Sequence, residues 1–289
     1  MEFNLPDFKK VVSWLINENM LLPRIGLLGG EPTLHPNFIE FLDHLLSKKI
    51  NTVVFTNGMI ENTKIYDDII DVALKNEIKH ANSFGFCLNV NEKKYRTKKE
   101  DILQKRFLEE LGRVSTLSFN IFEPDFDPYF LLEIILQHKC MKNIRIGLAS
   151  PLGNRNKFLK TKDFKVVGDK LSEFIRETSR NDVIVGFDCG FVRCMFPDNI
   201  GKELLKVEGW GHYCHPTIDV YPNLEVAYCY PLSKILKARM EDWKTSMDLY
   251  IHWSKEIRKY ELIYDQCPDC KYLSTETCDG GCKAHKANG

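Results

Sequence analysis

Four cysteines near the end of the chain have the spacing of a metal-binding motif. Cys267 and Cys270 are separated by two residues, Cys278 follows after seven more, and Cys282 after another three. Two glycines before Cys282 allow a tight turn. Thiolates at this spacing bind zinc or iron–sulfur clusters, and thiolate chemistry alone does not distinguish the two. The motif predicts a metal centre, and four incidental free cysteines are the weaker interpretation.

Four more cysteines bring the candidate ligands to eight. Cys214 and Cys229 enclose 14 residues whose pattern predicts two short strands joined by a Pro-Asn turn. A hairpin would bring both sulfurs to one centre, whereas the alternative is one buried and one exposed cysteine. Cys189 and Cys194 follow a predicted strand. Eight thiolates are what two four-cysteine clusters require.

A second candidate site is the turn Gly29-Gly30-Glu31-Pro32, which directly follows an apolar run. The two glycines let backbone groups approach a ligand closely, and the carboxylate can accept charge-assisted hydrogen bonds from an ammonium group. The alternative is an ordinary strand-to-helix turn with a solvated glutamate. The turn alone does not decide between these interpretations.

Strand and helix patterns alternate from residue 7 to about residue 196, which predicts strand–helix–strand units around a parallel sheet. The predicted strands are 24–30, 51–58, 83–90, 115–122, 143–149 and 182–188. The helices between and after them are predicted at 37–49, 64–77, 98–112, 128–140 and 161–179, after a first helix that begins near Asp7. Functional residues in such folds lie where strands end. The alternation stops after Phe196, so we expect two domains, 1–196 and 197–289.

Composition excludes several classes of protein. The 289 residues carry 40 basic and 40 acidic side chains and no basic run, so nothing indicates binding to nucleic acid. No apolar run approaches the roughly 18 to 20 residues that span a bilayer, and the first residues do not resemble a signal peptide. We therefore expect a cytoplasmic protein without a membrane partner. In that compartment a disulfide framework is a weaker explanation of the ten cysteines than metal chemistry.

The order of these motifs resembles the radical S-adenosylmethionine (radical SAM) enzymes that carry a SPASM or twitch extension. The resemblance implies an α/β fold, a partial (β/α)6 TIM-like barrel with its first strand missing, followed by a cysteine-rich auxiliary-cluster domain. It also implies that S-adenosylmethionine (SAM) lies across the strand ends. Glu31 would then bind the SAM amino group beside Gly29, Gly30 and Pro32. The next strand would end in the residues that shape the adjoining loop, Thr56, Asn57 and Gly58.

The resemblance further implies that the eight cysteines hold one or two auxiliary 4Fe-4S clusters. Three features depart from the family pattern. No Cys-x3-Cys-x2-Cys motif, which holds the SAM-reducing cluster, precedes the Gly-Gly-Glu turn; Leu224 replaces a usual glycine; and the tail ends at Gly289 without a further cysteine. Cys189, Cys194 or His285 would supply the remaining ligand.

These observations predict a radical SAM protein that, in its intact form, modifies a peptide or protein with electrons from a donor protein. The cofactor carries that chemistry and the protein positions it. Because the reducing-cluster motif is absent, we expect this chain to produce no 5′-deoxyadenosine. One alternative is a catalytically inactive barrel that binds a peptide or serves as a scaffold. Another is a zinc-stabilised α/β protein.

The remaining two cysteines are predicted not to be ligands. Cys87 lies inside an apolar strand pattern and Cys140 near the end of an amphipathic helix, where a free cysteine behaves as a small buried hydrophobe. Replacing either by alanine should leave the iron content of anaerobically reconstituted protein unchanged. A loss of about one cluster per chain from either variant, as expected for a lost cluster ligand, would contradict the assignment.

Overall fold

The computed structural model describes residues 2–16, 24–78, 83–152, 157–211, 213–260 and 264–288. Six strands pair in parallel and in chain order. They are β1 (Ile25–Leu27), β2 (Thr52–Thr56), β3 (Phe84–Asn89), β4 (Ser115–Ile121), β5 (Asn143–Leu148) and β6 (Ile184–Phe187). The predicted α/β class and parallel sheet are confirmed, whereas the expectation that a first strand is missing stays a prediction.

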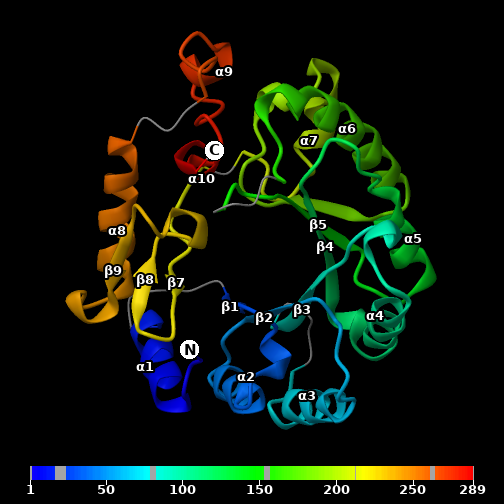
Figure 1. Ribbon diagram of the computed structural model, residues 1–289, viewed down its shortest axis with the longest axis vertical. Coiled ribbons are helices and arrows are strands. Elements are labelled where there is room, and N and C mark those ends of the chain that lie inside the picture. The colour runs from blue at the N-terminus through cyan, green and yellow to red at the C-terminus, as the bar shows by residue number, and fades with distance from the viewer. Residues whose placement is uncertain are drawn as a thin grey trace.

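Five helices connect or follow these strands and cover the outer face of the curved sheet (Figure 1). They are α2 (Phe38–Ser47), α3 (Lys64–Lys75), α4 (Lys98–Leu111), α5 (Tyr129–Gln137) and α6 (Phe164–Arg180). Each buries one apolar stripe; α6 does so with residues that include Val167, Leu171 and Phe174. Reciprocal hydrogen bonds between Thr97 and Glu100 fix the start of α4.

The two faces of the sheet differ because successive side chains of a strand point to opposite sides. Val54, Phe86 and Leu117 point outward into the helix layer and are at most 1% exposed. Their neighbours Phe55 and Ser118 point to the inner face, which therefore carries a different set of side chains. The outer face supplies the apolar core, whereas on the inner face Ser118 is buried and Phe55 is half-buried.

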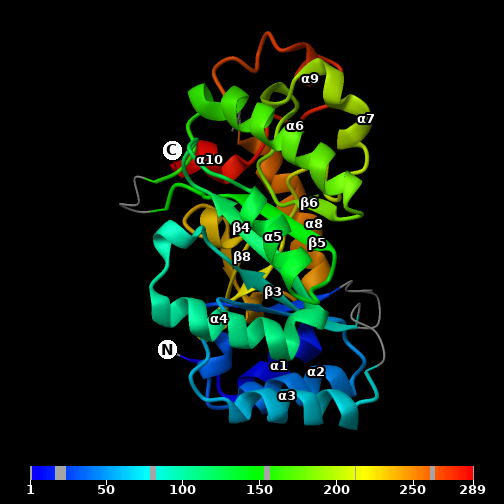
Figure 2. The same cartoon turned by 90° about the vertical axis from the view of Figure 1, so that its right-hand side faces the viewer.

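The C-terminal part lies on the concave side of this sheet in both views (Figures 1 and 2). It contains an antiparallel sheet of β7 (Asp219–Val220), β8 (Glu225–Ala227) and β9 (Lys237–Arg239), with α8 (Ser246–Glu256) beside it. Helix α1 (Leu5–Leu15) packs here as well, because the Trp14 indole donates to the Trp243 carbonyl at 3.0 Å. The two strands predicted between Cys214 and Cys229 are confirmed as β7 and β8.

The hydrophobic cores show how closely the two parts are joined. The core of the parallel sheet continues through Ile200, Leu204 and Val207 and includes Tyr264 and Cys267 from the tail. A second core joins Val11 of α1 to the residues of β8 and α8. The domain boundary near residue 197 stays a prediction. None of the helices described here is long and apolar enough to cross a membrane.

Candidate functional site

Glu31 ties the ends of two neighbouring strands together. Its Oε1 accepts hydrogen bonds from the Thr33 hydroxyl and the Thr56 hydroxyl, each at 2.8 Å, and from the Thr33 backbone N–H at 3.3 Å. Its Oε2 accepts from the Asn57 backbone N–H at 2.9 Å. The structure therefore brings the predicted turn after β1 against the predicted loop after β2. Because a carboxylate has about four acceptor positions, Oε2 keeps capacity for one further donor.

The glycines of the turn have the conformation that their residue type permits. Gly29 and Gly30 have φ values of +104° and +52°, and a Cβ at either position would meet no atom within 4 Å. Both residues are exposed. The backbone beside Glu31 is therefore strained for any other residue but open to a ligand, whereas Gly58 on the neighbouring loop is buried.

An ion pair on the inner face of the sheet is a feature that the sequence interpretation missed. Arg145 of β5 pairs with Asp188 after β6 and donates to the Ser118 hydroxyl at 3.2 Å. Its guanidinium lies 5.6 Å from the centre of the Phe55 ring. The side chains of Arg145 and Asp188 remain 31% and 40% exposed, so they are accessible. A charged residue inside an otherwise apolar strand is the signal that would have revealed it.

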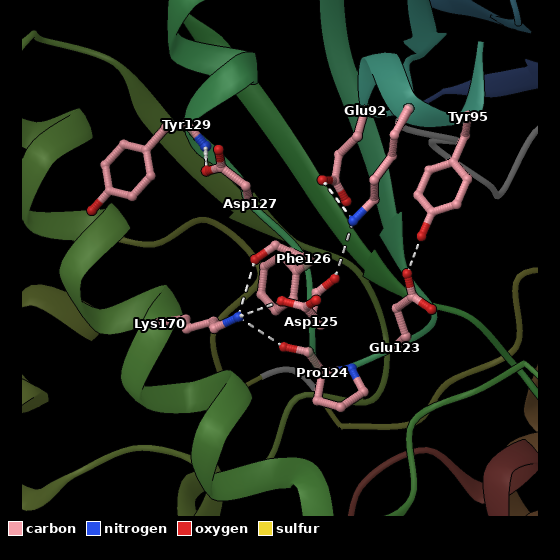
Figure 3. A network of polar contacts seen from close by, with 10 residues as sticks. Glu92, Tyr95, Glu123, Pro124, Asp125, Phe126, Asp127, Tyr129 and Lys170 are labelled. Atoms are coloured by element: carbon pink, nitrogen blue, oxygen red, sulfur yellow. Dashed lines mark hydrogen bonds and ion pairs between the residues drawn. The ribbon is translucent and has the colours of Figure 1, made fainter.

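The loop after β4 is held by polar contacts rather than by regular structure (Figure 3). Lys170 of α6 donates to the carbonyls of Pro124 at 3.0 Å and Phe126 at 3.3 Å. Tyr95, from the loop after β3, donates to the Glu123 carboxylate. These contacts join the loops after β3 and β4 to α6 at the same edge of the sheet as Glu31. These contacts therefore hold the loops at the carboxyl ends of β3 and β4 in place.

The eight predicted cysteines separate into two groups. We call Cys194, Cys267, Cys270 and Cys278 the tail quartet, because all four line one small cavity together with Val192, Tyr264, Tyr272, Leu273 and Gly280. Cys194 is exposed as a residue, but desolvation and then the charges of Cys278, Cys270 and Cys267 raise the pKa of its thiol to about 11. No carboxylate or histidine is among these lining residues.

We call the other four predicted ligands, Cys189, Cys214, Cys229 and Cys282, the hairpin quartet, after the strands β7 and β8 between Cys214 and Cys229. Desolvation, and then the charges of Asp188, Cys282 and Cys214, raise the pKa of Cys189 to about 12. Desolvation also raises the pKa of Cys229, with smaller effects from Cys282 and Cys214. A Cβ at Gly190 would stand 3.4 Å from the Cβ of Cys282, which places the end of β6 against the tail.

Asp279 joins the start of the hairpin to the tail. One of its carboxylate oxygens accepts from the Cys214 backbone N–H at 2.9 Å, and the other from the Gly281 backbone N–H at 3.1 Å. The Cys214 sulfur also lies 3.6 Å from the hydroxyl of Tyr228, which is fully buried. Among the described residues, no three or more His, Cys, Asp or Glu side chains already stand in an arrangement that could hold a metal ion. The ligand role of the cysteines stays a prediction.

The segment after β6 supplies one thiol to each quartet and packs tightly against α6. A Cβ on Gly168 of α6 would stand 1.8 Å from the carbonyl oxygen of Met195. The Phe187 ring stacks on Phe191 with centroids 4.0 Å apart, and Phe196 packs edge-to-face on Trp210 at 5.4 Å. Close backbone approach and aromatic packing therefore position Cys189 and Cys194, which lie outside any strand.

The other two cysteines lie elsewhere. Cys87 is 4% exposed in β3, and desolvation raises the pKa of its thiol. Cys140 is half-buried beyond α5, where desolvation raises the pKa of its thiol to about 11. Neither thiol lines the cavity of the tail quartet. His285, considered as a substitute ligand, is 6% exposed, and desolvation lowers the pKa of its imidazole to about 4.

Comparison with solved structures finds this fold in SuiB of Streptococcus suis. SuiB bound to S-adenosylmethionine matches with a TM-score of 0.63 at 14% sequence identity, over 90% of this chain and 62% of the SuiB chain. SuiB bound to the precursor peptide SuiA matches with a TM-score of 0.55 at 15% identity, over 90% and 61% of the two chains. The chain thus shares the fold of SuiB and spans less than two thirds of its length. No family model and no curated protein matches the sequence.

We expect Glu31 to contribute to stability independently of any ligand. In Glu31→Gln the amide nitrogen cannot accept a hydrogen bond, so at least one donor among Thr33, Thr56 and Asn57 loses its partner. The cost should be about 1–3 kcal/mol in the free energy of unfolding, measured by urea denaturation. Glu40→Gln, on the exposed face of α2, is the control and should change it by less than about 0.5 kcal/mol. Equal stability of the two variants would contradict the role of Glu31.

Gly168→Ala should destabilise the protein although alanine favours helices. The added methyl would overlap the Met195 carbonyl, and overpacking of this kind costs about 1–3 kcal/mol. Gly201→Ala is the control, because a Cβ there meets no atom within 4 Å. Urea denaturation of both variants tests the difference. A Gly168→Ala protein as stable as the Gly201→Ala protein would show that α6 and the segment after β6 do not touch as described.

Proposed function

We propose that the chain is an iron–sulfur protein of the radical SAM type with a SPASM- or twitch-like cysteine-rich domain, and that its intact form modifies a peptide or protein. The gathering of Cys194, Cys267, Cys270 and Cys278 around one cavity carries this proposal, because four thiolates are the ligand set of one cluster. The fold supports it, since SuiB has that fold and has been crystallised with S-adenosylmethionine and with a precursor peptide.

The tail quartet fits a 4Fe-4S cluster by the chemistry of its donors. Its four thiols face one cavity whose other lining residues are apolar, glycine or tyrosine, so no harder oxygen ligand competes. The hairpin quartet also offers four thiols. Asp188 lies near one of them, Cys189, and the sulfur of another, Cys214, contacts the Tyr228 hydroxyl. Both would hold auxiliary clusters, which store and transfer electrons when bound. Their reduction requires an electron-donor protein as a partner.

The turn at residues 29–32 and the loop at residues 56–58 form the proposed SAM site. The free acceptor position of Glu31 Oε2 would receive the SAM ammonium group, and the exposed backbone of Gly29 and Gly30 would lie against it. When bound, the cofactor supplies the means of hydrogen abstraction. The protein residues hold and orient it at the edge of the sheet.

The inner face of the sheet is the proposed place for a peptide substrate. Asn120 is exposed there, and the Arg145–Asp188 pair presents charged groups of both signs beside it. These side chains can donate to and accept from the amides and carbonyls of a peptide backbone. A neutral polar surface of this kind does not favour nucleic acid, which requires excess positive charge.

Metal analysis of cysteine variants tests the proposal. Anaerobically reconstituted chain should bind iron and sulfide. Cys270→Ser should remove the iron of the tail quartet and Cys214→Ser that of the hairpin quartet, each leaving about half of the wild-type content if each quartet binds one cluster. Cys140→Ala is the control and should retain all of it.

Two results would contradict this function. Zinc without iron or sulfide would support a zinc-stabilised protein instead. Loss of all iron from either single variant would show that the eight cysteines do not form two independent sites.

A further inference from the structure

Tyr264 is a buried tyrosine whose hydroxyl has no hydrogen-bond partner within the described part of the chain. The residue is 6% exposed, and among the described residues its oxygen has no hydrogen bond. Leaving such a group unpartnered is costly, so a buried tyrosine hydroxyl normally finds an acceptor. Within the described residues the Tyr264 hydroxyl therefore keeps a donor that a bound group could use.

The surroundings of Tyr264 indicate which acceptor that is. Tyr264 lines the cavity of the tail quartet, and its backbone carbonyl accepts from the Cys267 N–H at 2.8 Å. After desolvation, the charges that raise the pKa of its hydroxyl come from Cys282, Cys267, Cys194 and Cys278. Three of these four cysteines line the same cavity as Tyr264, and Cys282 belongs to the hairpin quartet.

The ring of Tyr264 is held in place from other directions. Phe164 of α6 packs against it edge-to-face at 5.5 Å, and the Lys286 ammonium lies 4.5 Å from its ring centre. Contacts to the ring, rather than a hydrogen bond of the hydroxyl, therefore fix the position of the hydroxyl. A fixed donor at a cluster is what tunes the cluster's reduction potential.

The hairpin quartet provides an internal comparison. There the buried Tyr228 hydroxyl lies 3.6 Å from the Cys214 sulfur, which serves as its partner. Each quartet thus has one buried tyrosine beside it. Tyr228 contacts a cysteine sulfur directly, whereas Tyr264 has no sulfur partner among the described side chains.

We infer that the Tyr264 hydroxyl donates a hydrogen bond to a sulfur of the cluster held by the tail quartet and raises the reduction potential of that cluster. The inference rests on the proposed function. A hydrogen bond to a cluster sulfur stabilises the reduced, more electron-rich form, which is why its loss lowers the potential. Tyr264 is a positioning and tuning residue, not a ligand.

Tyr264→Phe in the reconstituted full chain tests this role, because it removes one oxygen and keeps the ring. The variant should retain the wild-type iron and sulfide content. Its potentiometric titration, followed by electron paramagnetic resonance, should show a more negative midpoint potential for the cluster that Cys270→Ser removes. Tyr272→Phe is the matched control from the same cavity, because the Tyr272 hydroxyl already donates to Asp198 at 2.8 Å. Its potential should stay at the wild-type value.

Stability provides a second, independent measurement. Since the hydroxyl lacks a partner among the residues that the structure describes, Tyr264→Phe should not lower the urea midpoint of the metal-free chain, but it should lower that of the loaded chain. Unchanged potentials at equal iron content, an equal shift in Tyr272→Phe, or destabilisation of the metal-free chain would each overturn the inference. A wild-type chain that binds no iron would instead refute the proposed function, and the inference with it.

Discussion

The contact between α6 and the segment after β6 is the constraint on which the cysteine quartets depend. Gly168 lets the Met195 backbone approach α6 so closely that even a methyl group would not fit. This contact, with the stacking of Phe187 and Phe191, holds a segment that no strand ladder supports. Cys189 and Cys194 both belong to it and serve different quartets. One packing interaction therefore positions both candidate metal centres relative to the parallel sheet.

Side-chain hydrogen bonds do at the strand ends what ladder hydrogen bonds do within the sheet. Backbone groups in loops need partners as much as those in strands. Glu31 joins the loops after β1 and β2, Lys170 holds the loop after β4, and Asp279 joins the hairpin to the tail. Each is a charged group that accepts or donates to the backbone of a distant segment. Such contacts fix the rim while leaving the inner face accessible.

Burial of the thiols links folding to ligand binding. Desolvation raises the pKa of Cys282 to about 11, so in the metal-free chain this thiol is neutral at ordinary pH. A metal or cluster binds thiolates, so its binding must release the thiol protons. The binding free energy must also exceed the cost of burying the thiolates.

The sequence by itself determined the elements and the candidate ligands. The period of apolar residues predicted each of the six parallel strands, because a strand and a helix that bury one face must repeat their apolar residues at different intervals. Residue type and spacing identified eight cysteines and the Gly29–Gly30–Glu31 turn. Only the tertiary structure decided which of these meet. Cys189 and Cys194 are near neighbours in the chain but belong to different quartets. Arg145 of β5 forms an ion pair with Asp188, which follows β6. Spacing along a chain constrains local geometry, whereas partners from distant segments depend on how the elements pack.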